Sequence, residues 1–166
     1  MATPLFITST DLKQNTLING DLDVNKFLQF IKIAQEIHIQ NYLGGALYNK
    51  ISEDIIAGTL ENQYLLLVDT YIKDMLIHFA MVDYLPFSAF SVSNGGVFKH
   101  RSENSETATM NEVDVLVTKH RNFAQFYTRR FIDFMCFNNN DFPEYNASKN
   151  ADMYPDDTAN FVGWVL

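Results

Sequence analysis

Apolar residues recur at helical spacing along most of the chain and predict four helices. The first helix is expected over residues 24–43 and the second over residues 46–57. The third is expected over 62–85, where apolar residues fall on nearly every side, as in a helix buried at the centre of a domain. The fourth starts after Thr109 and continues to about residue 134. This pattern predicts a mainly α, four-helix bundle-like domain.

Residues with special backbone or capping properties mark the ends of these helices. Asp23 is a suitable N-cap for the first helix, and Gly44 with Gly45 is expected to stop it. Gly58 follows the second helix. Pro86 is expected to end the third, because proline cannot donate the backbone hydrogen bond that continues a helix.

The first helix carries two apolar stripes. One begins with Val24 and Phe27, and the other contains Phe30, Ile33 and Ile37. One stripe is sufficient to pack the helix on the core of its own domain. The second predicts either a helix at the centre of a single domain or a helix that another subunit covers, and the sequence leaves both open.

The fourth helix begins with a capping box, in which the side chains of Thr109 and Glu112 each accept the other's backbone amide. The residues expected on its buried side are Val113, Leu116, Val117, His120, Phe123, Ala124, Tyr127, Phe131 and Phe134. Its basic residues lie largely off this stripe: Lys119, Arg121, Arg129 and Arg130. We interpret them as a solvated face, with a basic strip toward DNA or an acidic partner as the weaker alternative.

A β-hairpin arm is expected over residues 88–100, between the third and fourth helices. Its turn would be Asn94-Gly95-Gly96, since these residues adopt the positive φ angles of a tight hairpin. A lone two-stranded hairpin is marginally stable in water, so we expect it to pack on a neighbouring molecule. The residues expected at that subunit or portal interface are Phe90, Val92, Asn94, Gly95, Gly96, Val97 and Phe98.

The two ends of the chain are expected to be extended. Residues 5–11 read as an extended segment that turns into a short helix start. We divide the chain into a helical domain over 1–145 and a polar C-terminal tail over 146–166. The tail closes on an apolar segment that is also assigned to the interface, with Phe161, Trp164 and Leu166. Docking on a partner and folding back on the same domain both stay open.

The composition favours a protein with its own core and without affinity for nucleic acid. Hydrophobic residues make up 47% of the 166 residues, which suits one domain. The 20 acidic and 12 basic residues give a net charge of −8, whereas proteins that bind phosphate carry basic patches.

Charged residues interrupt the longest apolar segment, 64–85, so we expect no membrane span. Cys136, the single cysteine, is expected to be a buried inert thiol.

Candidate chemistry is sparse along the chain. The four histidines, His38, His78, His100 and His120, lack the Glu-x-x-His motif of metal-binding bundles, so we expect solvated or internally hydrogen-bonded rings. The stretch 21–32 begins like a calcium loop but has lysines at the positions of its required glycine and last glutamate. The glycine pairs do not match nucleotide-binding patterns. We therefore expect no catalytic residues, no metal and no cofactor.

Several segments, taken in order, resemble the head–tail connector (adaptor) proteins of tailed phages, particularly phages of Bacteroidetes, including crAss-like phages. The resemblance covers residues 5–145 and lies in order and spacing. The segments that carry it are Phe6-Ile-Thr-Ser-Thr-Asp11-Leu12, Ile33-Ala-Gln-Glu-Ile37 with Tyr42-Leu-Gly-Gly-Ala-Leu-Tyr48, Val92-Ser-Asn-Gly-Gly-Val97, Ser102-Glu-Asn-Ser-Glu106, and Phe126-Tyr127 through Ile132 to Asn138-Asn-Asn-Asp-Phe-Pro-Glu-Tyr145.

This resemblance implies a non-enzymatic virion protein of the neck, made in the cytoplasm of the bacterial host. Such proteins form a ring, commonly twelvefold, beneath the portal, and they join the capsid to the tail. The implied partners are copies of the chain itself, the portal protein and the next neck or tail ring protein. DNA would pass through the lumen without specific binding. The alternative is a monomeric all-α protein-binding or regulatory module that uses the arm and the aromatic tail.

Overall fold

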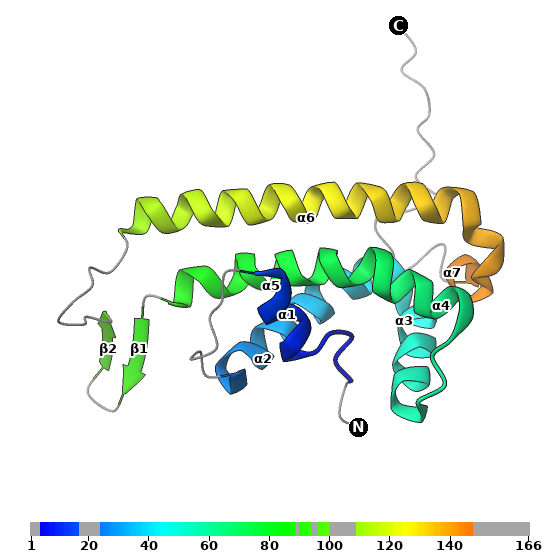
Figure 1. Ribbon diagram of the computed structural model, residues 1–166, viewed down its shortest axis with the longest axis horizontal. Helices are drawn as coiled ribbons and strands as arrows, with labels where there is room; N and C mark the ends of the chain where they lie inside the picture. The colour runs from blue at the N-terminus through cyan, green and yellow to red at the C-terminus, as the bar shows by residue number, and fades with distance from the viewer. Residues whose placement is uncertain (1–3, 17–23, 89, 94–95, 100–108, 148–166) are drawn as a thin grey trace, which may run out of the picture.

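The longest apolar stretch of the chain becomes the central helix of the structure, as predicted. In this computed structural model it comprises α4 (Asn62–Leu67), the π-helical segment η2 (Val68–Ile72) and α5 (Lys73–Ser88), which follow one another without a break. Helix α5 packs against α6 (Met110–Asn138) and against α2 (Val24–Ala34) (Figure 1). Burying one large aliphatic side chain contributes about 1.5–3 kcal/mol, so this helix supplies much of the stability. Its fully buried residues include Leu67, Ile72, Met75, Leu76 and Ala80.

The structure describes residues 4–16, 24–88, 90–93, 96–99 and 109–147. The remaining elements in this range are α1 (Ser9–Asn15), the π-helical segment η1 (Gln35–Ile39), α3 (Gln40–Ala57), β1 (Phe90–Ser93), β2 (Gly96–Lys99), the 3₁₀ helix η3 (Asn139–Asp141) and α7 (Pro143–Ala147). Asp23, the predicted N-cap of the first helix, lies outside these residues.

Two glycines turn the chain where the sequence predicted helix ends. Gly44 has φ 72° and ψ 159°, and it breaks the helical backbone inside α3. Only glycine adopts this combination without strain. Gly58 has φ 68° and ψ 27° and caps the C-terminus of α3. The predicted stop at Gly44 and the predicted cap at Gly58 are both confirmed.

A buried glutamine attaches the N-terminal segment to the helices. The side chain of Gln35, which is fully buried in η1, accepts a hydrogen bond from the Phe6 amide at 2.8 Å. Its amide group donates to the Pro4 carbonyl at 2.8 Å and to the Tyr48 hydroxyl at 3.0 Å. Every polar atom of the Gln35 side chain is therefore engaged, and Phe6 is held in the core.

The predicted capping box at Thr109 is present, and α1 begins with a similar box at Thr8. Helix α6 extends 29 residues from its cap, and it lies along the whole length of α5 (Figure 1). Beyond it, Phe142 is fully buried between η3 and α7, a packing position that the polar composition of this stretch did not indicate. The short helix α7 crosses the boundary that was predicted at residue 145, between the helical domain and the C-terminal tail.

The structure corrects the predicted fold class. We expected a protruding β-hairpin arm as a defining part of a four-helix bundle-like domain, and that prediction is wrong. The described residues are overwhelmingly helical, whereas β1 and β2 have four residues each and pair only with each other. The core of the described residues comes from the helices, with Phe6, Ile7 and Phe142 added from the segments beside them. The mainly α part of the prediction is confirmed.

Pro86 also lies differently from the prediction. It was expected to end the third helix, but α5 continues past it to Ser88. Proline loses its amide hydrogen bond and its ring crowds the preceding turn, and here both effects fall in the last turn of the helix. The helix therefore extends three residues beyond the predicted end at 85.

We expect that Gly44→Ala lowers the free energy of unfolding by about 2 kcal/mol, because alanine is strained at a positive φ with an extended ψ. Gly58→Ala is the matched comparison: its added Cβ meets no atom within 4 Å, so only the milder left-handed strain of about 1 kcal/mol applies. Urea unfolding followed by circular dichroism measures both. Equal, negligible losses would contradict the assignment of strain to Gly44.

We expect that Gln35→Leu lowers the free energy of unfolding by about 3 kcal/mol, because it leaves the Phe6 amide and the Pro4 carbonyl without their partner. Gln40→Leu, at an exposed position of α3, is the control and should stay within about 0.5 kcal/mol of the wild type. Thermal and urea unfolding compare the two variants. A Gln35→Leu protein as stable as the control would show that the glutamine does not anchor the N-terminal segment.

Candidate functional site

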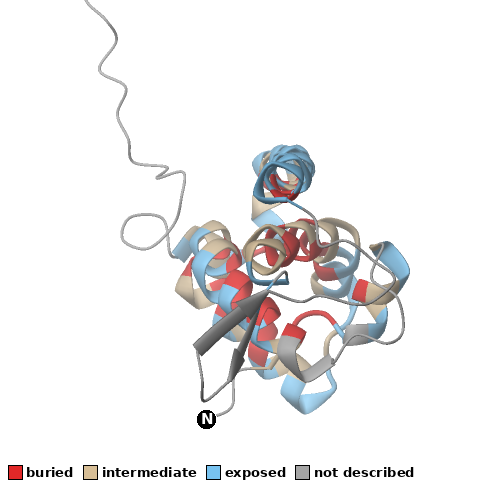
Figure 2. Cartoon of the chain, turned by 90° about the vertical axis from the view of Figure 1, so that its left-hand side faces the viewer, coloured by how far each residue is buried: buried red, intermediate tan, exposed pale blue. Residues whose placement is uncertain are grey.

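Helix α6 contacts the rest of the molecule along one side only. In the end-on view, α6 stands as a layer of its own above the other helices and is largely exposed away from them (Figure 2). The residues of α6 that are buried against the body are Val113, Val117, Ala124, Thr128, Phe131 and Met135. A helix that is buried along one side needs apolar residues on that side only, and its other positions can be polar.

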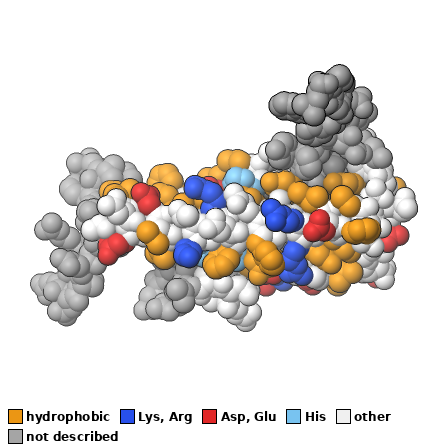
Figure 3. Space-filling view, turned by 90° about the horizontal axis from the view of Figure 1, so that it is seen from above, with side chains coloured by type: hydrophobic (Ala, Val, Ile, Leu, Met, Phe, Trp, Pro, Cys, Tyr) orange, Lys and Arg blue, Asp and Glu red, His pale blue; other side chains and the backbone are white. Residues whose placement is uncertain are grey.

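The exposed side of α6 is nevertheless rich in large apolar side chains. We call the following five residues the α6 flank: Val115 (60% exposed), Leu116 (46%), Phe123 (49%), Phe126 (59%) and Phe137 (88%). Seen from above, hydrophobic side chains lie in a row along this face with lysine and arginine among them (Figure 3). Exposed aromatic residues that gather on one face are typical of a surface that binds a partner.

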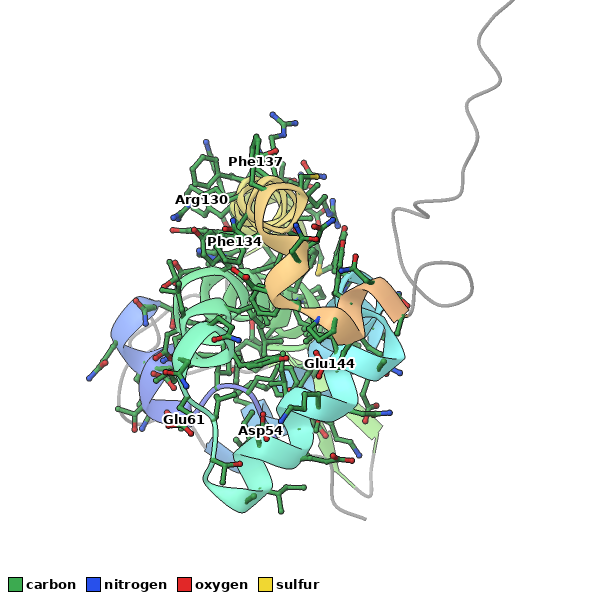
Figure 4. All side chains as sticks on the ribbon, turned by 90° about the vertical axis from the view of Figure 1, so that its right-hand side faces the viewer. Asp54, Glu61, Arg130, Phe134, Phe137 and Glu144 are labelled. Atoms are coloured by element: carbon green, nitrogen blue, oxygen red, sulfur yellow. The ribbon has the colours of Figure 1, made fainter. Side chains whose placement is uncertain are left out.

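The charged residues beside the α6 flank include Arg130, whose guanidinium lies 5.7 Å from the ring centre of Tyr71 and 5.8 Å from that of Tyr127. Tyr71, Arg130, Phe134 and Phe137 line a groove of about 340 Å³ that is open to solvent. Phe137 points away from the body of the molecule (Figure 4). The groove thus combines aromatic surface with the positive charge of Arg130 and the negative charge of Asp133, which suits a protein partner better than a small substrate.

A second exposed apolar surface is formed by residues of α2 and η1 together with the end of α5. We call Ile33, Ile37 and Phe87 the α2 patch; their side chains are 40%, 53% and 62% exposed. The ring of Phe30 lies 5.4 Å from that of Phe87 and connects the end of α5 to this helix. The second stripe predicted for the first helix is therefore only partly covered, since Phe30 is buried and the two isoleucines are not.

A pair of histidines joins α5 to α6. The Nδ1 atoms of His78 and His120 are 3.0 Å apart, so one ring donates its N–H to the unprotonated nitrogen of the other. Tyr127 stacks on His78 with ring centres 5.4 Å apart. Burial lowers the pKa of His78 to about 4, with repulsion from His120 as the second cause, and burial also lowers the pKa of His120. The pair acts as a neutral clasp between the helices.

The other polar clusters of the structure connect elements. The Nζ atom of Lys73 lies 3.1 Å from Asp11 and 3.0 Å from Asp69, so it ties α1 to the central helix. Tyr64 donates a hydrogen bond of 2.7 Å to Glu144 of α7, and burial with the neighbouring carboxylate raises the pKa of Tyr64 to about 12. Both clusters face neighbouring helices, which is the arrangement of structural contacts.

The described residues contain no group of three or more His, Cys, Asp or Glu side chains that is placed to hold a metal ion. His38 stacks on Phe79 with ring centres 4.0 Å apart, and its Nε2 lies 3.7 Å from Asp83.

No helix in the described part of the chain is both long and apolar enough to cross a membrane. Cys136 is exposed, so its predicted burial is wrong: it lies on the solvent side of α6.

The structure places only some of the interface residues that the sequence predicted. Phe90 is 37% exposed at the start of β1, and the backbone of Val92 pairs with that of Val97. Gly96 and Phe98 pair with Ser93 and Ser91 in the same ladder. The other predicted residues lie outside the described range: Asn94, Gly95, Phe161, Trp164 and Leu166.

The α6 flank was not predicted from the sequence. Leu116 and Phe123 were assigned to the buried stripe, and Val115, Phe126 and Phe137 were not assigned to any surface. The sequence does contain a signal for this surface: α6 has more apolar residues than one buried stripe requires. Val115 and Phe126 lie on the side of the helix opposite the predicted core positions. An apolar excess of this kind predicts a second contact surface.

The histidine clasp makes stability depend on pH. Because the pKa of His78 is lower in the folded than in the unfolded protein, the unfolded chain binds more protons between pH 6.5 and about 4. The free energy of unfolding should be highest above pH 6.5 and fall by roughly 1–3 kcal/mol toward pH 4, after allowance for solvent screening. His78→Phe should flatten this part of the profile. Urea unfolding at several pH values measures it, and parallel profiles would contradict the clasp.

Comparison with known proteins gives one family. The model of the family described as "Family of unknown function (DUF6712)" matches residues 39–154, from the π-helical segment η1 to beyond α7. Neither the curated proteins nor the solved structures give a significant match to this chain. Because the match covers more than half of the sequence, the chain belongs to the DUF6712 family of unknown function.

Proposed function

We propose that this protein is a structural subunit of the neck of a tailed phage. It assembles into a ring beneath the portal, joins the capsid to the tail and extends the channel through which the genome leaves. Its partners are further copies of the chain, the portal and the next neck or tail component. The resemblance of residues 5–145 to head–tail connector proteins is the reason for proposing this particular assembly, a ring in the neck.

The observation that carries this proposal is the presence of two separate exposed apolar surfaces on one small chain. The α6 flank and the α2 patch lie on different helices, and each leaves large apolar side chains exposed by 40% or more. A subunit of a closed ring contacts one neighbour through one surface and the other neighbour through a different surface. Two unlike apolar surfaces meet this requirement.

The charge of the chain supports a passive role toward DNA. The net charge is −8, so the protein lacks the excess of cations that gives phosphate binding its strength. An acidic subunit repels the backbone of the duplex. In the proposed ring, DNA therefore passes through the lumen without being held.

The alternative function is a monomeric all-α module that binds another protein. The α6 flank by itself supports it, because one exposed aromatic surface is sufficient to bind one partner. The two proposals differ in what the α2 patch does: the ring uses it, and the monomeric module leaves it exposed. Assembly with portal protein therefore distinguishes them.

We expect rings of the wild-type protein to form on portal particles from the same phage, as seen by electron microscopy. Replacing both Ile33 and Ile37 with Asp should abolish these rings, because charges at an apolar contact lose their hydration without gaining a partner. Gln29→Asp with Gln40→Asp is the matched control, since both glutamines are exposed and polar on the same helical stretch. The control should still assemble.

Two results would count against the ring. If the wild type stays separate from portal particles under all conditions, the proposed function is wrong. If the isoleucine variant assembles as well as the glutamine control does, the α2 patch is not a ring contact, and the monomeric module is favoured. Circular dichroism of each variant checks that the helices remain folded.

A further inference from the structure

Three of the most exposed apolar residues of α6 recur at equal intervals. Val115, Phe126 and Phe137 are separated by 11 residues each, and their side chains are 60%, 59% and 88% exposed. Eleven residues make slightly more than three whole turns, so these side chains fall on nearly one line, with a drift of about 20° per interval. The line lies about 200° around the helix from the buried Ala124, on the outer side of α6.

Two charged residues lie on the same line and at mirrored positions. Lys119 stands seven residues before Phe126, and Asp133 stands seven residues after it. In the described part of the chain, neither has an ion-pair partner within 4.0 Å. About 21 Å of helix separates them, so they cannot pair with each other within one molecule. The line therefore has a free cation on one side of its centre and a free anion on the other.

We propose that this line of α6 binds the same line of a second copy of the chain, antiparallel, about a twofold axis at Phe126. In this register, residue pairs whose numbers sum to 252 meet: Phe126 faces Phe126, Val115 faces Phe137, and Lys119 faces Asp133 of the second copy. The spacing of the line, four, seven, seven and four residues, reads the same in both directions. A twofold contact requires this self-complementarity.

The charges select the antiparallel arrangement over the parallel one. A parallel pair in register would place Lys119 against Lys119 and Asp133 against Asp133, two like-charge contacts that destabilise pairing. The antiparallel pair replaces them with two opposite-charge contacts and keeps an aromatic pair at the axis. A slip of one helical turn in either direction would separate all of these partners. The sequence of α6 thus specifies orientation and register together.

Figure 3 shows the face that this pairing uses, with hydrophobic side chains along α6 and basic residues among them. Two crossing helices bury less area than a typical obligate interface, so the dimer is expected to be weak and concentration-dependent. The inference goes beyond the proposed function and does not depend on it. A twofold contact closes on itself and cannot continue around a ring, so a molecule paired in this way would have to separate before its α6 flank contacts a ring neighbour.

Sedimentation equilibrium of the full chain over micromolar to millimolar concentrations tests the proposal. The wild type should approach twice the monomer mass. Lys119→Asp alone should weaken the dimer about tenfold, because it sets two Asp–Asp contacts where two Lys–Asp pairs stood. Asp133→Lys alone should do the same. The combined variant, Lys119→Asp with Asp133→Lys, restores opposite charges across the axis and should recover the wild-type association.

Matched controls separate this contact from a general charge effect. Arg121→Asp makes the same charge reversal at an exposed position on the other side of α6 and should leave association unchanged. Phe126→Asp places two carboxylates at the axis and should abolish the dimer, whereas Gln125→Asp, at the neighbouring exposed position, should not. The effect of Lys119→Asp should shrink in high salt, because salt screens exposed charges.

Three outcomes would overturn the proposal. The first is a wild type that remains monomeric at millimolar concentration. The second is a dimer that neither Phe126→Asp nor the single charge reversals weaken, or whose reversals the combined variant does not rescue. The third is a monomer in which Phe126→Asp shifts the emission of Trp164, the only tryptophan, to longer wavelength. That shift would show that the C-terminal segment of the same chain occupies the α6 flank.

Discussion

The structure depends on covering one helix that is apolar on nearly every side. Helix α5, with α4 and η2 before it, contributes fully buried residues such as Ile72, Met75 and Leu76. A helix of this kind is stable in water only if other helices enclose it. Helix α2 with η1 covers one side and α6 covers another, and Gln35 attaches the N-terminal segment to the same core. The order of the layers follows from this requirement.

Because α6 covers α5 from outside, only one side of α6 is buried and the other side is exposed. A single outer helix uses one side for the core and exposes the rest, and the histidine pair holds it in place. On the exposed side, large apolar residues stand where charged ones would normally be. Exposed apolar side chains lower solubility, and a partner molecule that covers them would remove this disadvantage. The physical case for an assembly component therefore rests on the described helices and does not involve the β-hairpin.

The elements of the fold were predictable where local rules determine them. Helix periodicity located the central helix, and the capping box located the start of α6 at Thr109. Gly44 and Gly58 turned the backbone as expected, because their φ values suit glycine alone. The errors arose where burial depends on what a distant part of the chain covers. Leu116, Phe123 and Cys136 were expected to be buried, but their side chains are exposed on α6.

By itself, the sequence determined the helical class, the central position of α5 and the absence of a nucleotide-binding or metal-binding motif. These follow from spacing and residue type, which act over a few turns of chain. Only the tertiary structure decided which of several apolar stripes became core and which became surface. A stripe is identical in sequence whether its own domain or a second molecule covers it. The difference between Phe131, which is buried, and Phe126, which is not, arises from packing between helices that are distant in the chain.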